Sequence, residues 1–278
     1  MIINDSDREV IIREKFLRKE FSEDDLNYFL DTINSLKQYI IKVSENLHRE
    51  QISYPLMVNK IINSENFSMT RIQDGEWTCM LKIEPHYTNK MSSKFKKYEI
   101  DKQSERLLEI IKSNPKYYIS VNAGTFDQRS NFVWPLIKKI ENLYVGEIFR
   151  RASVENSLTD FISALKKRKV IIVGPDWLKK MINHFDFEFV KTEFPGIYEE
   201  TNVIKLERET EIIIEKCKEE NPVILYSCGL MAKILIDKYY HKYGNTITQI
   251  DMGAVWDPYC GKITRPYHKK IIDKVHKK

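Results

Sequence analysis

Two carboxylates that are one residue apart, Asp74 and Glu76, follow a short β-rich run at residues 68–72. An irregular turn at the end of a strand can aim both side chains at one point, where they would share a hard cation. Mg²⁺ and Mn²⁺ prefer oxygen ligands, often one or two carboxylates completed by water and substrate phosphates. Gly75 would let the backbone approach such a ligand closely. The alternative is an ordinary helix start, with Asp74 as the N-cap and Glu76 in the first turn.

The elements that would position these carboxylates alternate regularly from residue 66 onward. Expected strands are residues 68–72, 117–121, 143–148, 170–173, 187–190, 223–226 and 247–250. Expected helices are residues 102–113, 130–141, 157–168, 177–184, 203–219 and 229–242. Strand, helix, strand at this rhythm is typical of right-handed βαβ units. The sequence therefore predicts an α/β fold, a Rossmann-like and mostly parallel sheet with helices on both faces.

Ligands of such sheets bind beyond the carboxyl ends of the strands, where this sequence is rich in polar residues and glycine. Arg71 is a candidate cation for phosphate oxygens, although it equally suits a structural ion pair. Main-chain N–H groups at the helix starts after Gly174 and Gly229 would add donors, since helix N-termini attract phosphate. The candidate residues for binding a phosphate-bearing ligand at this edge are Arg71, Gly75, Asn122, Gly174, Asp176, Ser227 and Gly229.

Residues 67–77, Phe-Ser-Met-Thr-Arg-Ile-Gln-Asp-Gly-Glu-Trp, resemble the strand-plus-R-I-G-D-G-E signature of glycosyltransferases with the GT-D fold. Residues 170–175 resemble that family's strand ending in Gly-Pro, and residues 225–235 its strand, glycine turn and helix. The order and spacing hold over residues 66–255. Gln73 stands where the family usually has glycine, and the sequence after Gly253 departs from the commoner family ending.

The resemblance implies a metal-dependent transferase. Asp74 and Glu76 would hold Mn²⁺ or Mg²⁺ at the diphosphate of a nucleotide-sugar donor, most simply a UDP-sugar, and a hexose or pentose would pass to a hydroxyl of a glycan or glycoconjugate acceptor. The expected general base is a carboxylate of the last strand and loop, Asp251 or Asp257, which can accept the hydroxyl proton within hydrogen-bond reach. Asp251 can instead anchor the following loop, and Asp257 before Pro258 has the composition of a turn.

Two other function classes fit parts of the sequence. A Rossmann-like methyltransferase would use an acidic residue after a strand to hold ribose hydroxyls, and a metal requirement separates it from the leading hypothesis. A basic module that binds nucleic acid or another polyanion, without catalysis, would show steep salt dependence. Zinc hydrolase, serine hydrolase, P-loop and dinucleotide motifs are all missing from the sequence.

Composition bounds the remaining choices. The 278 residues carry 45 basic and 40 acidic side chains, a net charge of +5, and the four cysteines form no C-x-x-C pair. Reducing cytoplasm is the expected location, and no apolar run reaches the roughly 18 residues that span a bilayer. We expect a helical segment at residues 1–50, whose apolar stripe from Leu26 to Leu47 makes a homodimer conceivable, and a catalytic domain at 51–278. A nucleic-acid partner is not expected.

Overall fold

The computed structural model describes residues 53–81, 97–121, 136–137, 140–145, 148–155, 158–194 and 196–275. Three expectations therefore lie outside the described residues. They are the helical segment at 1–50 with its dimer stripe, most of the helix at 130–141, and Asn122.

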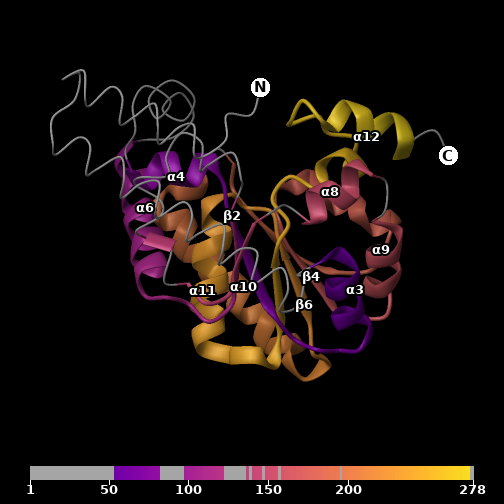
Figure 1. Cartoon of the computed structure of the whole chain (residues 1–278), viewed down its shortest axis with the longest axis horizontal. Coiled ribbons are helices and arrows are strands. Elements are labelled where there is room, and N and C mark those ends of the chain that lie inside the picture. The colour runs from indigo at the N-terminus through magenta and orange to yellow at the C-terminus, as the bar shows by residue number, and fades with distance from the viewer. Residues whose placement is uncertain are drawn as a thin grey trace, which may run out of the picture.

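Seven parallel strands form one sheet in the order β3-β2-β1-β7-β6-β4-β5 (Figure 1). The strands are β1 (Ser68–Ile72), β2 (Tyr118–Val121), β3 (Leu143–Val145), β4 (Val170–Gly174), β5 (Glu188–Lys191), β6 (Val223–Tyr226) and β7 (Thr248–Asp251). Every neighbouring pair is parallel, which confirms the predicted α/β, Rossmann-like sheet. Its central strands are buried along their whole length, as expected of a sheet that is covered on both faces.

Helices fill the connections between the strands. The α-helices are α3 (Tyr54–Ile62), α4 (Asp74–Leu81), α6 (Lys97–Lys112), α8 (Ile148–Val154), α9 (Thr159–Leu165), α10 (Glu200–Cys217), α11 (Leu230–Tyr243) and α12 (His268–Val275). Short 3₁₀ helices are η1 (Asp176–Asn183), η2 (Gly196–Tyr198), η3 (Lys218–Glu220), η4 (Gly244–Thr246) and η5 (Asp257–Cys260). In the described part of the chain, no helix has the length and apolar character needed to cross a membrane.

Two sequence expectations about these elements were wrong. The strand expected at 143–148 ends at Val145, and Ile148 begins α8 instead. Phe149, Ala152 and Ser153 are the buried residues of this stretch, and their spacing of three and four is that of a helix. The helix expected at 177–184 is the 3₁₀ helix η1. The helices α3, α8 and α12 were not predicted, and α4 corresponds to the helix start that the sequence left open at Asp74.

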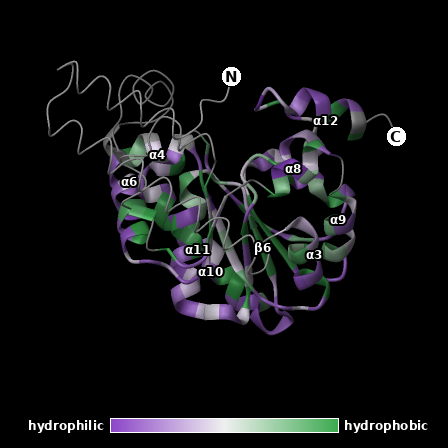
Figure 2. Cartoon of the chain, in the orientation of Figure 1, coloured by the Kyte–Doolittle hydropathy of each residue, from purple (hydrophilic) through white to green (hydrophobic). Residues whose placement is uncertain are grey.

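Two hydrophobic cores lie on opposite faces of the sheet because successive strand residues point to opposite sides. In β4, Ile171 and Val173 join one core, while Val170 and Ile172 join the other. Residues of α4, α6, α10 and α11 join the first core, and residues of α3, α8, α9 and α12 join the second. Figure 1 shows α6 and α11 on one side of the sheet and α3 and α9 on the other. Hydrophobic residues are concentrated on the central strands between these layers (Figure 2).

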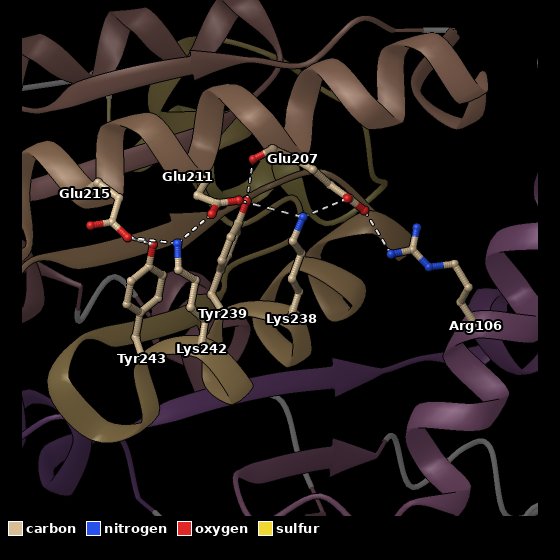
Figure 3. Close-up of polar contacts among 8 residues, drawn as sticks. All are labelled: Arg106, Glu207, Glu211, Glu215, Lys238, Tyr239, Lys242 and Tyr243. Carbon is tan, nitrogen blue, oxygen red and sulfur yellow. Dashed lines mark hydrogen bonds and ion pairs between the residues drawn. The ribbon is translucent and has the colours of Figure 1, made fainter.

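A ladder of ion pairs fastens α10 to α11 on the outer surface. Lys238 lies 2.9 Å from Glu207, and Lys242 lies 2.6 Å from Glu211 and 2.9 Å from Glu215. From the pair Lys238–Glu207 to the pair Lys242–Glu211, both helices advance by four residues in the same direction, so they run parallel. Figure 3 shows the complete ladder, which comprises Arg106, Glu207, Glu211, Glu215, Lys238, Tyr239, Lys242 and Tyr243.

Candidate functional site

Strands β1 and β7 separate at the carboxyl edge of the sheet. β1 stays paired with β2 as far as Ile72, but with β7 only as far as Met69. Beyond the end of the β1–β7 pairing, the N–H of Arg71 donates to Oδ2 of Asp251 at 3.2 Å. A side-chain oxygen thus takes the place of a backbone carbonyl of β7 as the acceptor. The other carboxylate oxygen, Oδ1, accepts the N–H of Gly253 at 3.0 Å. The opening between the two strands is thus filled by the Asp251 carboxylate, which has no solvent exposure.

Lys233, in the first turn of α11, places its ammonium between two carboxylates. Its Nζ lies 2.9 Å from Oδ2 of Asp251 and 2.8 Å from Oε1 of Glu76, and donates to the carbonyl of Gly229 at 3.1 Å. The side chain is only 3% exposed. Burial lowers the pKa of Lys233, but Asp251 and Glu76 outweigh it, and the pKa is raised above its usual value. Lys233 is therefore a charged lysine at neutral pH.

Glu76 is held at both of its carboxylate oxygens. Oε1 faces Lys233, and Oε2 accepts the N–H of Gln73 at 3.0 Å. The N–H of Trp77 donates to the carbonyl of Gln73 at 3.1 Å, so Gln73 is the N-cap of α4 and Glu76 its third residue, which reaches back as in a capping box. The structure thus adopts the helix-start alternative for the backbone, but the expected N-cap was wrong: Gln73 is the N-cap, and Asp74 is the first residue of α4. The side chain of Asp74 lies outside the described part of the structure.

Arg71 completes a group of four charges, Arg71, Glu76, Lys233 and Asp251, which we call the edge cluster and of which Glu76 alone is partly exposed. One guanidinium nitrogen of Arg71 lies 3.7 Å from Oδ1 of Asp251. The same nitrogen occupies the space above Gly253, where an added Cβ would approach it to 1.8 Å. Gly253 also has a φ of +53°, which favours glycine. Arg71 therefore forms the structural ion pair that the sequence left open.

Tyr198, in η2, lies beside the edge cluster and was missed by the sequence analysis. Burial raises the pKa of its hydroxyl, the nearby Glu76 raises it further, and a hydrogen bond with the backbone of Leu230 partly opposes both. The hydroxyl lies 3.2 Å from the point where a Cβ on Gly229 would be. The start of α11, expected to offer main-chain donors to phosphate, is thus covered by this tyrosine.

Other predicted residues at the same edge have local roles. Gly174 is tightly packed, since an added Cβ would approach Leu178 to 2.6 Å and the Cβ of Ser227 to 3.2 Å. Asp176 is exposed and lies 2.7 Å from Lys179, whose hydrogen bond lowers the pKa of the Asp176 carboxyl. These residues lie at the ends of β4 and β6, so the fold brings them to the predicted edge.

Asp257 anchors the loop that leads to α12. Its Oδ1 accepts the indole N–H of Trp177 at 2.9 Å, and its Oδ2 accepts the hydroxyl of Thr264. Its carbonyl accepts the N–H of Lys262 at 2.8 Å. Asp257 is only 5% exposed. Asp251 and Asp257 were the carboxylates expected to supply a general base. Both therefore accept hydrogen bonds from donors of the protein itself.

The described side of the D-x-E segment at this edge consists of Glu76 and Gly75. Within the described residues, no three His, Cys, Asp or Glu side chains gather as a metal site. Two carboxylates are nevertheless enough when phosphates and water complete the coordination. Glu76 has the support that a metal-binding carboxylate usually has, since its oxygens are already hydrogen-bonded, and a carboxylate offers about four lone-pair sites. Gly75 is exposed and leaves the space beside it open.

Comparisons of the chain with protein-family models, with curated proteins and with solved structures give no match. The function is therefore inferred from the chemistry of the edge cluster and from the D-x-E segment.

Proposed function

We propose that the protein is a metal-dependent glycosyltransferase, which moves a sugar from a nucleotide-sugar donor, a UDP-sugar, to a hydroxyl of a glycan or glycoconjugate. The observation that carries the proposal is the position of Glu76. It belongs to the D-x-E segment, lies at the carboxyl edge where Rossmann-like sheets bind their ligands, and is held at both oxygens before any ligand arrives.

Asp74 and Glu76 would hold Mn²⁺ or Mg²⁺, which supplies positive charge to the leaving diphosphate when bound. The chain itself keeps the Glu76 carboxylate in one orientation through Lys233 and the N–H of Gln73. Such preorganisation avoids the cost of rearranging the site on binding. Lys233 is a positioning residue, because its side chain is buried and acts through Glu76 and Asp251.

The edge cluster also balances charge. Arg71 and Lys233 offset the carboxylates of Glu76 and Asp251, so the edge cluster is formally neutral. Unbalanced carboxylates would repel a diphosphate, whereas a neutral cluster leaves the anionic donor free to approach the metal. Asp251 and Asp257 have structural roles in this scheme, and we propose no proton transfer for either.

The test is a panel of nucleotide sugars assayed for Mn²⁺-dependent donor hydrolysis, with Asp74→Asn and Glu76→Gln beside the wild type. Glu109→Gln is the matched control, since Glu109 is exposed on α6. We expect one UDP-sugar to be hydrolysed only with metal, and both site variants to lose this activity while the control keeps it. Binding of S-adenosylmethionine instead, without a metal requirement, would favour the methyltransferase alternative. Polyanion binding that survives both variants, with no donor hydrolysed, would favour the binding module.

A further inference from the structure

Residues 262–270 form a basic surface, which we call the basic arm. It comprises the loop after η5 and the first residues of α12. Its cations are Lys262, Arg265, Lys269 and Lys270, all exposed, and the stretch contains no acidic residue. Hydrophilic residues prevail on this loop and on the start of α12 (Figure 2). The nearest acidic residue on α12 is Asp273, on the following turn.

An apolar side chain lies among these charges. Ile263 is 54% exposed, and it borders an open hollow of about 350 Å³. The hollow is lined by Ile263, Thr264, Arg265, Pro266 and Lys269. An exposed isoleucine is not needed to bind a hydrophilic polyanion. Cations beside an exposed apolar side chain match the interface of a bilayer, where headgroup charge and acyl chains meet.

The basic arm is fixed in shape. The Thr264 hydroxyl donates to Asp257, and the Thr264 N–H donates to Nδ1 of His268 at 3.2 Å. Arg150 of α8 lies over the ring of Tyr267 at 5.5 Å, and Ile271 of α12 is buried in the second hydrophobic core. The cations are therefore presented on a prebuilt loop, which reduces the ordering cost of binding.

The basic arm also lies at the same edge of the sheet as the edge cluster. Helix α12 contacts η5, which follows β7, and α8, which follows β3. Figure 1 shows α12 and α8 beyond the same ends of the strands as α4. A surface bound by the basic arm would therefore face the carboxyl edge.

We propose that the basic arm docks the protein on a bilayer containing anionic phospholipid, with a phosphate-bearing headgroup at the hollow and Ile263 entering the interface. The docked protein would turn its carboxyl edge toward the lipid. This inference goes beyond the proposed sugar transfer and does not depend on it, since docking is measured without a donor or an acceptor.

The test is cosedimentation with vesicles of phosphatidylglycerol and phosphatidylcholine, compared with vesicles of phosphatidylcholine alone. Each cation near an anionic surface strengthens binding by roughly fivefold, so Arg265→Gln with Lys269→Gln should weaken it by about 25-fold. The matched control is Lys166→Gln with Lys167→Gln. This pair is equally exposed, but it follows α9 and precedes β4, at the opposite edge of the sheet. The control should change binding by less than about twofold.

Two further measurements separate a bilayer from other anions. Ile263→Ser should weaken vesicle binding several-fold without altering its dependence on salt, because an apolar contact is lost and no charge changes. Circular dichroism spectra of all variants establish that they are folded.

The proposal is overturned if the wild type binds both kinds of vesicle equally, or if the two double variants lose binding equally. It is also overturned if glycerol phosphate displaces the protein as well as vesicles of equal phosphate content do, since the hollow would then take a free phosphate.

Discussion

Replacement of Lys233 by methionine tests the edge cluster most severely. The ammonium is buried, and it touches Asp251, which is fully buried, and Glu76, which is 13% exposed. Methionine fills a similar volume but leaves these two carboxylates without their shared cation. Removing one partner of a buried ion pair typically costs about 3 to 5 kcal/mol. The loss is large against the roughly 5 to 15 kcal/mol that stabilises a typical domain, and it corresponds to a fall in Tm of roughly 10 °C.

Urea unfolding followed by circular dichroism measures this loss, with Lys242→Met as the control. Lys242 lies on the same helix and also contacts two carboxylates, but its side chain is 42% exposed. Its replacement should move the urea midpoint by only a small fraction of the Lys233→Met shift, because exposed ion pairs contribute little. Adding Glu76→Gln to Lys233→Met should cost less than the sum of the single changes, since one stranded carboxylate is neutralised.

A loss below about 1 kcal/mol for Lys233→Met would refute this reasoning, because an ion pair of that strength is typical of a solvated surface. Strict additivity with Glu76→Gln would equally show that Lys233 and Glu76 are not in contact in solution.

Three other predictions concern individual residues. Gly253→Ala should destabilise the protein strongly and release Arg71 from Asp251, because the added Cβ collides with the guanidinium; urea unfolding measures this, and an unchanged midpoint would contradict it. Burial lowers the pKa of His268, although Asp257 opposes the shift. The folded state thus resists protonation, and stability present above about pH 6.5 should decline as the pH falls below that value. Urea midpoints measured above and below about pH 6.5 test this decline. The variant His268→Gln is the comparison, and it should flatten the decline. Hydrogen bonds from Lys242, Tyr243 and Lys218 lower the pKa of Glu215 to about 2, so its carboxyl signal in an NMR titration should not move near pH 4.

Most of the sheet could be predicted because its strands are short β-rich runs that are buried on both faces. The run 223–226 matches β6 at both ends, and 68–72 matches β1. The error at 143–148 arose because apolar Ile148 follows soon after the run 143–145, past Gly146 and Glu147, and was joined to that strand. Phe149 and Ala152 are instead buried at helical spacing. Short helices such as α3 and α12 carry too few periodic residues to be recognised alone.

The candidate site was only partly predictable. Arg71, Glu76 and Asp251 were expected at one edge, and the fold brings them together. Lys233 was not expected, because a lysine in a helical pattern is usually a surface residue. Its burial depends on β7 lying between β1 and β6, which sets residues far apart in sequence around one ammonium. The alternative that Asp251 anchors the following loop was open in the sequence, and the N–H of Gly253 fulfils it. The donor from Trp177 to Asp257 comes from another element, which a linear pattern does not indicate.

The central claim is that the D-x-E carboxylates hold a divalent metal together with a nucleotide diphosphate. The most direct measurement is the affinity for Mn²⁺ in the presence of UDP, followed by electron paramagnetic resonance, for the wild type, Glu76→Gln, Lys233→Met and the exposed control Glu109→Gln. The account predicts that UDP tightens Mn²⁺ binding, that Glu76→Gln and Lys233→Met each weaken it by about 10 to 100-fold, and that the control does not change it. Equal Mn²⁺ affinity in all four proteins, or no effect of UDP, would contradict it.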